Sequence, residues 1–342
     1  MSDPAPSVSV VMPTFNKASF LERTLASWTH QAATGYELVI VDDGSTDDTP
    51  AVIARYAARL PIHHTRIANA GRGPARNHGL ARARGEIIVF SDDDMLISPG
   101  YVESYRRVLG APGNVVALGW QQRLVVELRP HEPIAATALH RMFEARPALR
   151  QAIAQGQAAA TITAAEVERE PGVIEPFIVD DPWFVKRALV AIAMFGDDIS
   201  RCTLAWAFGT TGNMAVRRDT LAGVGGFDPR FVGWGIEDTE LHYRLAKAGA
   251  TTRYNRDAVS YHQNHPRDEV ALMRSWWRNL RTMTAKHPGV ELAVYMRLIS
   301  DALTLEETEQ MFAELRAHPE APAARAAEHA LHGQPGELSA GA

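Results

Sequence analysis

Val8-Ser9-Val10-Val11-Met12-Pro13 is a short, continuously apolar run that ends at a proline. Such a run is typical of a strand buried on both faces of a parallel sheet, and proline cannot continue the hydrogen-bonded ladder. Leu21, Leu25 and Trp28 follow at helical spacing, and Asn16 is the expected N-cap of that helix. The chain is therefore expected to open with a strand and a helix that covers one face of the sheet.

The same unit recurs downstream. A strand is expected at residues 38–41, and a helix with an apolar stripe at residues 52–60. The third unit has an extended segment at 62–67, a glycine-rich loop, a short helix near 75–83 and an apolar strand at 87–91. This alternation predicts an open α/β sheet of mostly parallel strands flanked by helices.

Ligands of open α/β sheets bind beyond the carboxyl ends of the strands. Polar side chains follow three of the expected strands, and they comprise Thr14, Asp42, Asp43, Asp92, Asp93 and Asp94. We therefore expect these residues to converge on one edge of the sheet, where a ligand would bind.

The composition is that of a folded protein without strong electrostatic bias. Of 342 residues, 46% are hydrophobic and 22% are charged, and the formal net charge is −5. No global positive field is available for nucleic acid or anionic lipid, so DNA is a poor candidate partner. The single cysteine, Cys202, excludes an intrachain disulfide and a cysteine-built zinc site, which favours a reducing cytoplasm.

Membrane-spanning segments are not expected. The first residues lack a basic segment followed by an apolar one, and no stretch approaches the ~18 apolar residues of a spanning helix. The longest candidate, residues 188–195, is expected to be part of a core helix. We therefore expect a cytoplasmic protein, and peripheral contact at the inner face of the membrane stays open.

Two clusters could bind a divalent cation. Asp92 and Asp94 are carboxylates separated by one residue, which can hold Mg2+ or Mn2+ against phosphates, although a solvated acidic turn is the alternative. His262 and His265 follow an apolar segment, and imidazole is a normal ligand of manganese or zinc. Two histidines three residues apart would also suit an exposed loop.

Two loops have nucleotide-binding character. The segment at residues 42–47 fails the calcium-loop pattern, because its glycine comes too early, and it is better explained as a turn with a ligand-facing carboxylate or as a helix cap. The segment at residues 71–79 begins like a dinucleotide fingerprint, but Arg76 replaces the third glycine. A Rossmann dehydrogenase is thus disfavoured, while Arg76 can still offer its donor fork to a phosphate or a base.

The turn at residues 233–238 combines an aromatic ring with two carboxylates. Trp234 can pack on the apolar face of a sugar, and Glu237 and Asp238 can accept protons from hydroxyls. A helix N-terminus favoured by acidic residues is the alternative. The turn is therefore a candidate carbohydrate acceptor site.

Taken together, the segments at residues 10–16, 41–45 and 69–79 and the cluster Asp92–Asp94 resemble the GT-A fold inverting glycosyltransferases of the family 2 type. The segment at residues 212–238 resembles the galactosyltransferase and chondroitin-polymerase branch. The resemblance implies an inverting, metal-dependent transferase that moves a hexose or N-acetylhexosamine from a UDP-sugar or other nucleotide sugar to a hydroxyl of a saccharide or glycoside. Transfer to a polyprenyl phosphate and noncatalytic nucleotide-sugar binding are the alternatives.

The resemblance also implies roles for individual residues. The nucleotide-sugar site would comprise Pro13, Thr14, Asp42, Asp43, Arg76, Asp92 and Asp93, with Asp42 at the uracil, Arg76 at the nucleotide and Asp92 at the ribose or donor sugar. Asp94 and His262 would hold Mn2+ or Mg2+, with His265 in reserve. Asp238 and Glu237 would be the catalytic residues, with Asp238 as the general base and Glu237 orienting the acceptor. The acceptor would contact Trp234, Gly235 and Glu237.

Four regions follow from this interpretation. Residues 1–120 are expected to be the nucleotide-sugar-binding half of a GT-A domain, and residues 206–265 the acceptor-binding half. Residues 121–205 are expected to be a helical insert or linker without a counterpart in the family pattern. Residues 266–342 are expected to form a helical C-terminal extension, with helix near 305–331, and a tail.

Overall fold

The structure is a computed structural model that describes residues 6–179 and 182–318. The strands are β1 (Val8–Thr14), β2 (Tyr36–Asp42), β3 (Ile62–Arg66), β4 (Ile87–Ser91), β5 (Met95–Ile97), β6 (Val115–Leu124), β7 (Glu127–Leu128), β8 (Ala159–Ala160), β9 (Ile178–Val179), β10 (Asn213–Arg217) and β11 (Thr251–Gln263).

The helices lie between and after these strands. They are α1 (Ala18–Trp28), α2 (Thr49–Ala57), α3 (Arg72–Leu80), α4 (Tyr101–Leu109), α5 (Ala136–Ala145), α6 (Ala148–Ala154), α7 (Ala164–Arg169), α8 (Pro182–Phe195), α9 (Arg218–Ala222), α10 (Glu237–Lys247), α11 (Glu269–Lys286), α12 (Val290–Ile299) and α13 (Leu305–Ala317), with the 3-10 helices η1 (Pro171–Phe177) and η2 (Ala205–Phe208).

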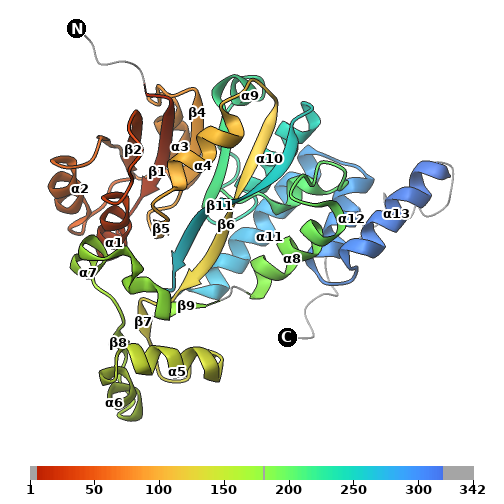
Figure 1. Ribbon diagram of the computed structural model, residues 1–342. Helices are drawn as coiled ribbons and strands as arrows, with labels where there is room; N and C mark the ends of the chain where they lie inside the picture. The colour runs from red at the N-terminus through yellow and green to blue at the C-terminus, as the bar shows by residue number, and fades with distance from the viewer. Residues whose placement is uncertain (1–5, 180–181, 319–342) are drawn as a thin grey trace, which may run out of the picture.

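The main sheet has the strand order β3-β2-β1-β4-β10-β6-β11-β5, with β9 paired to β6 (Figure 1). Strands β3, β2, β1 and β4 are parallel, as expected for repeated strand-and-helix units. β10 is antiparallel to both β4 and β6, and β11 is parallel to β6. The predicted α/β sheet is confirmed, and an antiparallel strand joins its two halves.

Alternate residues of β1 enter two separate cores, because successive side chains of a strand point to opposite faces. Val10 and Met12 pack in the core that contains the apolar faces of α1, α2 and α4. Val11 packs in the core that contains residues of α8 and of α10 to α13. Burial on both faces explains why the run is continuously apolar instead of alternating.

The start of α1 differs from the expectation. Asn16 does not cap the helix: its φ is 51°, and its Oδ1 accepts a hydrogen bond from Thr46 N at 2.7 Å. The helix begins at Ala18, whose N–H donates to Asp47 Oδ2 at 3.0 Å. An acceptor from the next loop therefore satisfies this helix end, which a local sequence signal cannot predict.

The region expected to be an insert is largely helical, with α5, α6, α7 and α8. β6 runs across the expected boundary at residue 120, so the main sheet continues into this region. The helices α5 and α6 lie apart from the sheet, at the lower left of Figure 1.

The helical C-terminal extension is confirmed by α11, α12 and α13. Residues 319–342, which include the end of the expected helix near 305–331 and the expected tail, lie outside the described residues. Within the described ranges, no helix has both the length and the apolar character that crossing a bilayer requires.

One buried amide joins the centre of the sheet to α4. Asn213, at the start of β10, accepts hydrogen bonds at Oδ1 from the hydroxyls of Tyr101 at 2.7 Å and Tyr105 at 2.6 Å. Its Nδ2 donates to Ser260 Oγ at 2.8 Å and to Ala258 O at 2.9 Å on β11. The side chain therefore satisfies polar groups of α4 and β11 inside the core.

Replacement of Asn213 by alanine should remove the shared acceptor of two tyrosine hydroxyls and a donor to a buried carbonyl. We expect Asn213→Ala to lower the free energy of unfolding by about 3 kcal/mol, measured by urea denaturation. Asn114→Ala is the matched control, because Asn114 is exposed, and its loss should change stability by less than about 0.5 kcal/mol. Equal stability of the two variants would contradict this account.

Candidate active site

A cavity of about 760 Å³ lies at the carboxyl ends of β1, β2 and β4. Residues from both halves of the chain line it, most of them polar, and they include Pro13, Thr14, Lys17, Asp43, Gly71, Arg72, Arg76, Asp92, Asp93, Asp94, Trp234, His262, His265 and Arg267. The convergence expected from the strand ends is thus present, with one exception among the acidic residues.

That exception is Asp42, which does not line the cavity. Its carboxylate is fully buried, and Oδ1 accepts from Ser45 N at 2.8 Å. The neighbouring Asp43 does line the cavity, and its two oxygens accept from Ala70 N at 2.7 Å and Gly71 N at 2.8 Å. The structure therefore places Asp43 at the ligand side and Asp42 inside the turn.

Asp94 lies among three nitrogen groups. Its Oδ2 is 3.3 Å from Lys17 Nζ and 3.1 Å from His265 Nε2, and its Oδ1 is 3.7 Å from His262 Nε2. Burial alone would raise the pKa of Asp94, but its contacts with His262, His265 and Lys17 hold that pKa well below its usual range. Asp94 is therefore a carboxylate at neutral pH.

Both histidines direct Nε2 toward positively charged groups. His265 Nδ1 lies 3.0 Å from Pro266 O, and its Nε2 faces both the Lys17 ammonium, which donates, and Asp94 Oδ2, which accepts. His262 Nε2 lies 2.8 Å from an Arg267 guanidinium nitrogen, which can only donate. Burial, with a smaller effect of Arg267, lowers the pKa of His262, so its ring is neutral at pH 7.

These residues fit a divalent cation. One atom each from Asp94, His262 and His265 lies within 4.8 Å of the others, and a carboxylate with two neutral imidazoles is a donor set that Mn2+ accepts. The Lys17 ammonium, 3.1 Å from His265 Nε2, shows that the cluster already attracts a cation. His265 is therefore as well placed as His262.

A buried arginine joins the two halves of the site. Arg76, only 2% exposed, donates from Nη2 to Asp92 Oδ1 at 2.8 Å and from Nη1 to Glu237 Oε1 at 3.2 Å. The guanidinium also lies over the aromatic ring of Phe227, whose centroid is 5.4 Å from the guanidinium carbon. Asp92 comes from the end of β4 and Glu237 from the start of α10, so Arg76 fixes one relative to the other.

The turn before α10 is strained and packed. Ile236 has φ of 74°, which is costly for a β-branched residue, and such strain persists only where the surroundings impose it. Gly235 faces α11, since a Cβ there would lie 2.6 Å from Trp276 Cδ1, and its carbonyl accepts from Asn279 Nδ2 at 2.8 Å. Trp234, which directly precedes these two residues, lines the cavity.

Asp238 lies beside this cavity, although neither it nor Glu237 is among the lining residues. Its Oδ2 accepts from Thr211 N at 3.4 Å, and a Cβ on the adjoining Gly212 would lie 3.5 Å from Asp92 Oδ2. Burial and the neighbouring charge of Glu237 raise the pKa of Asp238 to about 6, against the opposing effect of Arg76. Such a carboxylate is suited to proton transfer near neutral pH.

Comparisons with known proteins agree with this geometry. Residues 9–157 match the description "Glycosyl transferase family 2", and residues 198–265 match "N-terminal domain of galactosyltransferase". The first part of the chain is therefore similar to glycosyltransferase family 2, and the relatives of the chain are glycosyltransferases. Of the expected assignments, the resemblance to this family and the GT-A type of fold are thus confirmed.

The alignments with individual relatives cover similar shares of this chain but different shares of each relative. A validoxylamine A glucosyltransferase of Streptomyces hygroscopicus subsp. jinggangensis is 32% identical over 83% of this chain and 62% of its own length. The chondroitin synthase of Escherichia coli is 28% identical over 80% of this chain and 37% of its own length. The chain thus spans less than two thirds of the validoxylamine A glucosyltransferases that it matches, at 62% and 58%.

A solved structure shares the fold. The mannosyltransferase of Pyrobaculum calidifontis, in complex with GDP-Man and Mn2+, superposes with a TM-score of 0.52 over 96% of this chain and 81% of that one. Sequence identity is 20%, so this likeness concerns the fold alone.

Three basic residues of the site are not among the site residues expected from the sequence. Lys17, Arg72 and Arg267 all line the cavity. A signal existed for Lys17 and Arg72, because each lies in a loop or helix start that directly follows a strand of the ligand-binding edge. The contact of Arg267 with His262 depends on the turn after β11, for which the sequence carries no such signal.

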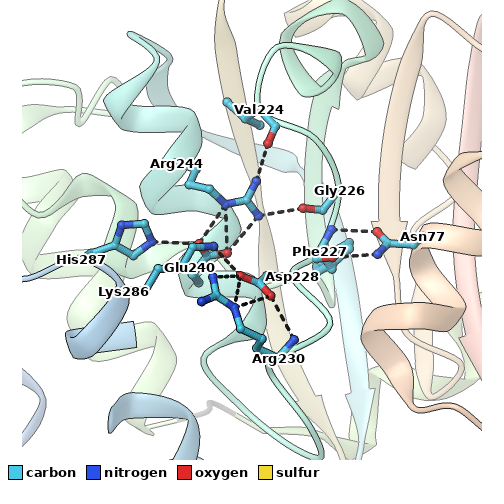
Figure 2. Close-up of polar contacts among 10 residues, drawn as sticks. All are labelled: Asn77, Val224, Gly226, Phe227, Asp228, Arg230, Glu240, Arg244, Lys286 and His287. Carbon is cyan, nitrogen blue, oxygen red and sulfur yellow. Dashed lines mark hydrogen bonds and ion pairs between the residues drawn. The ribbon is translucent and has the colours of Figure 1, made fainter. Parts of the chain in front are cut away.

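An ion-pair network holds α10 in place (Figure 2). The fully buried Glu240 accepts hydrogen bonds from Arg244 at 2.9 Å, Lys286 at 2.6 Å and His287 at 2.9 Å. Lys286 also donates to Asp228 at 2.6 Å. A single carboxylate of α10 thereby joins the end of α11 to the loop before the strained turn.

The network is connected to α3, in the first half of the chain, through the loop at residues 224–228 (Figure 2). Arg244 donates to Val224 O and Gly226 O, each at 2.7 Å. Asn77 of α3 pairs with the backbone of Phe227, accepting from its N–H and donating to its carbonyl, each at 2.7 Å. Glu240 is therefore a positioning residue for the start of α10.

Glu240→Gln should lower the free energy of unfolding by about 3 kcal/mol at neutral pH, because three partly buried donors lose the buried charge that they surround. Glu103→Gln, at an exposed carboxylate paired with Arg106, is the control and should change it by less than about 0.5 kcal/mol.

The pH dependence of this difference provides a second check. Burial acts to raise the pKa of Glu240, but its bonds to Arg244, Lys286 and His287 outweigh burial and lower it. A lowered pKa gives stabilisation that is present above the usual carboxyl pKa and is lost as pH falls. The parent and Glu240→Gln should therefore converge in acid, as measured by urea denaturation at several pH values, and a constant difference would refute the assignment.

Proposed function

We propose that this chain is an inverting, metal-dependent glycosyltransferase that moves a hexose or N-acetylhexosamine from a nucleotide sugar, with UDP-sugars first, to a hydroxyl of a saccharide or glycoside. The observation that carries the proposal is the shared cavity, where the Asp94–His262–His265 cluster faces the strand ends and Trp234 comes from the second half of the chain. The match of residues 9–157 to glycosyltransferase family 2 supports the reaction class.

The nucleotide would bind along the edge formed by β1, β2 and α3. We assign Asp43, in place of Asp42, to the base, because a cavity-lining carboxylate can accept a hydrogen bond from the imide N–H of uracil. Pro13 and Thr14 form the adjoining wall, and the partly exposed Arg72 offers donors to phosphate. Arg76 acts from behind this wall by holding Asp92 toward the ribose or donor sugar.

Asp94, His262 and His265 would hold the metal, with Asp93 beside them. When bound, a divalent cation supplies positive charge against the leaving diphosphate. Lys17 contacts two of these three residues, so its ammonium is positioned to share the same anionic group.

Asp238 is our candidate general base. In a single displacement, the acceptor oxygen bonds to the anomeric carbon opposite the departing oxygen, the bond to the nucleoside diphosphate breaks, and the acceptor proton passes to the Asp238 carboxylate. Glu237 is buried against Arg76, which favours a positioning role over direct acceptor contact. Trp234 would support the sugar face, and Gly235 allows the turn to pack on Trp276.

A panel of nucleotide sugars, scored by release of nucleoside diphosphate with saccharide acceptors, tests the proposal. UDP-glucose belongs in that panel because a related protein is named as a glucosyltransferase. The proposal would be refuted if no combination of nucleotide sugar and acceptor gave release of nucleoside diphosphate.

Metal removal should abolish turnover. We expect chelation to stop nucleoside diphosphate release, and Mn2+ to restore it, because the leaving group would lose its counter-charge. Asp94→Asn, His262→Ala and His265→Ala should each weaken Mn2+ binding, measured directly by calorimetry on the folded protein. His287→Ala, which removes a histidine from the separate Glu240 network, should leave Mn2+ binding unchanged. Full turnover by metal-stripped protein in chelator would exclude the metal role.

The Asp238 assignment predicts a specific pH profile. Because a base must be ionised and burial raises its pKa to about 6 in the free protein, kcat/KM should be constant above that pH and fall about tenfold per unit below it. Asp238→Asn should lower kcat by about 10²- to 10⁴-fold with unchanged nucleotide binding.

Two variants serve as controls for this profile. Glu237→Gln removes the charge that raises the Asp238 pKa, so the acid limb should move to lower pH. Asp257→Asn, at an exposed carboxylate paired with Arg107, should leave the profile unchanged. An Asp238→Asn protein within a few-fold of the parent would remove Asp238 from the base role.

A further inference from the structure

Exposed apolar side chains concentrate on one helix. Six large hydrophobic residues of the described ranges are exposed, and four of them belong to α11 or to the loop packed on it. Val270, Met273 and Trp277 of α11 are 70%, 45% and 36% exposed, and Val232 is 58% exposed. Val232 lies against α11, because its carbonyl accepts hydrogen bonds from Arg278 and Asn279. Scattered single exposures are normal, but a cluster marks an interaction surface.

Helical spacing places an apolar stripe and a row of arginines side by side on this surface. Val270, Met273 and Trp277 recur at intervals of three and four residues and so share one side of α11. Arg274 and Arg281 lie next to that side and are also exposed. These three apolar residues, with Arg274, Arg278 and Arg281, are termed the α11 face below.

The charge of the α11 face differs from that of the whole chain. The chain has a formal net charge of −5, whereas this face carries three arginines and no acidic residue. Asp268 and Glu269 lie in the first turn, and Asp268 Oδ1 is engaged by Ala271 N at 3.0 Å as the helix cap. The face is therefore a local basic and apolar surface on an acidic protein.

The opposite side of α11 is fixed to the protein near the cavity. Ala271, Leu272 and Ser275 line the cavity, and Leu280 and Met283 are buried in the core. A partner bound at the α11 face would therefore lie beside the mouth of the site without entering it.

We propose that the α11 face binds the surface of an anionic lipid bilayer. A helix that buries apolar side chains to the level of the head groups, with arginines beside them, gains both from apolar burial and from attraction to anionic lipid. Tryptophan and arginine suit that boundary, because each has an apolar body and a polar end. Since no helix in the described part of the chain can span a bilayer, this contact is at the surface.

Vesicle flotation of the full chain tests the proposal. The parent should bind vesicles of phosphatidylcholine mixed with phosphatidylglycerol, bind phosphatidylcholine alone much more weakly, and dissociate at high salt. Arg274→Glu combined with Arg281→Glu should weaken binding to the mixed vesicles by about twentyfold or more, at about fivefold per arginine. Val270→Ser, Met273→Ser and Trp277→Ser combined should weaken binding at least about tenfold.

Matched controls separate this surface from general effects. Arg150→Glu reverses an exposed arginine on α6, and Leu189→Ser replaces an exposed apolar residue of α8, which is 50% exposed. Neither should alter vesicle binding, and circular dichroism should show that all variants are folded. No binding of the parent to anionic vesicles, or equal losses in control and test variants, would overturn the proposal.

Vesicle binding needs neither donor nor acceptor, so its outcome is independent of the proposed transferase function. A protein that releases nucleoside diphosphate but ignores vesicles would refute only the α11 face. One that binds vesicles through that face but transfers no sugar would refute only the function.

Discussion

A buried positive charge must have partners, and the site is organised around the one carried by Arg76. Its guanidinium reaches Asp92 at the end of β4 and Glu237 at the start of α10. These two carboxylates belong to regions far apart in the sequence, so the arginine can be satisfied only when both halves of the chain are folded together. The geometry of the cavity therefore depends on the same ion pairs that make burial of Arg76 tolerable.

The first half of the fold could be predicted because its signals are local. The run at Val10 and Val11 and the apolar stripe of α1 lie within single elements, and a parallel sheet follows from their repetition. That same logic placed Thr14 and Asp94 at one edge. The antiparallel insertion of β10 between β4 and β6 has no comparable signal, since it depends on pairing across about a hundred residues or more of intervening chain.

Adjacent residues were harder to assign than whole segments. Asp42 and Asp43 are identical in type, yet one is sealed inside the turn by Ser45 and the other faces the cavity. Which of the two faces the ligand depends on the backbone path after β2, which a motif does not encode. The expected N-cap role of Asn16 is wrong for the same reason. Its positive φ directs its side-chain amide to Thr46 and away from the start of α1.

The contact of Lys17 with Asp94 bears on the stability of the fold when no metal ion is bound. Domains built around structural zinc lose their fold with the ion, because nothing else balances their ligands. Here an ammonium from the loop after β1 already compensates the carboxylate, and the tertiary core forms from apolar contacts on both sides of the sheet. The fold therefore does not depend on a metal ion at this cluster, and release of a cation bound there would not expose the chain to unfolding.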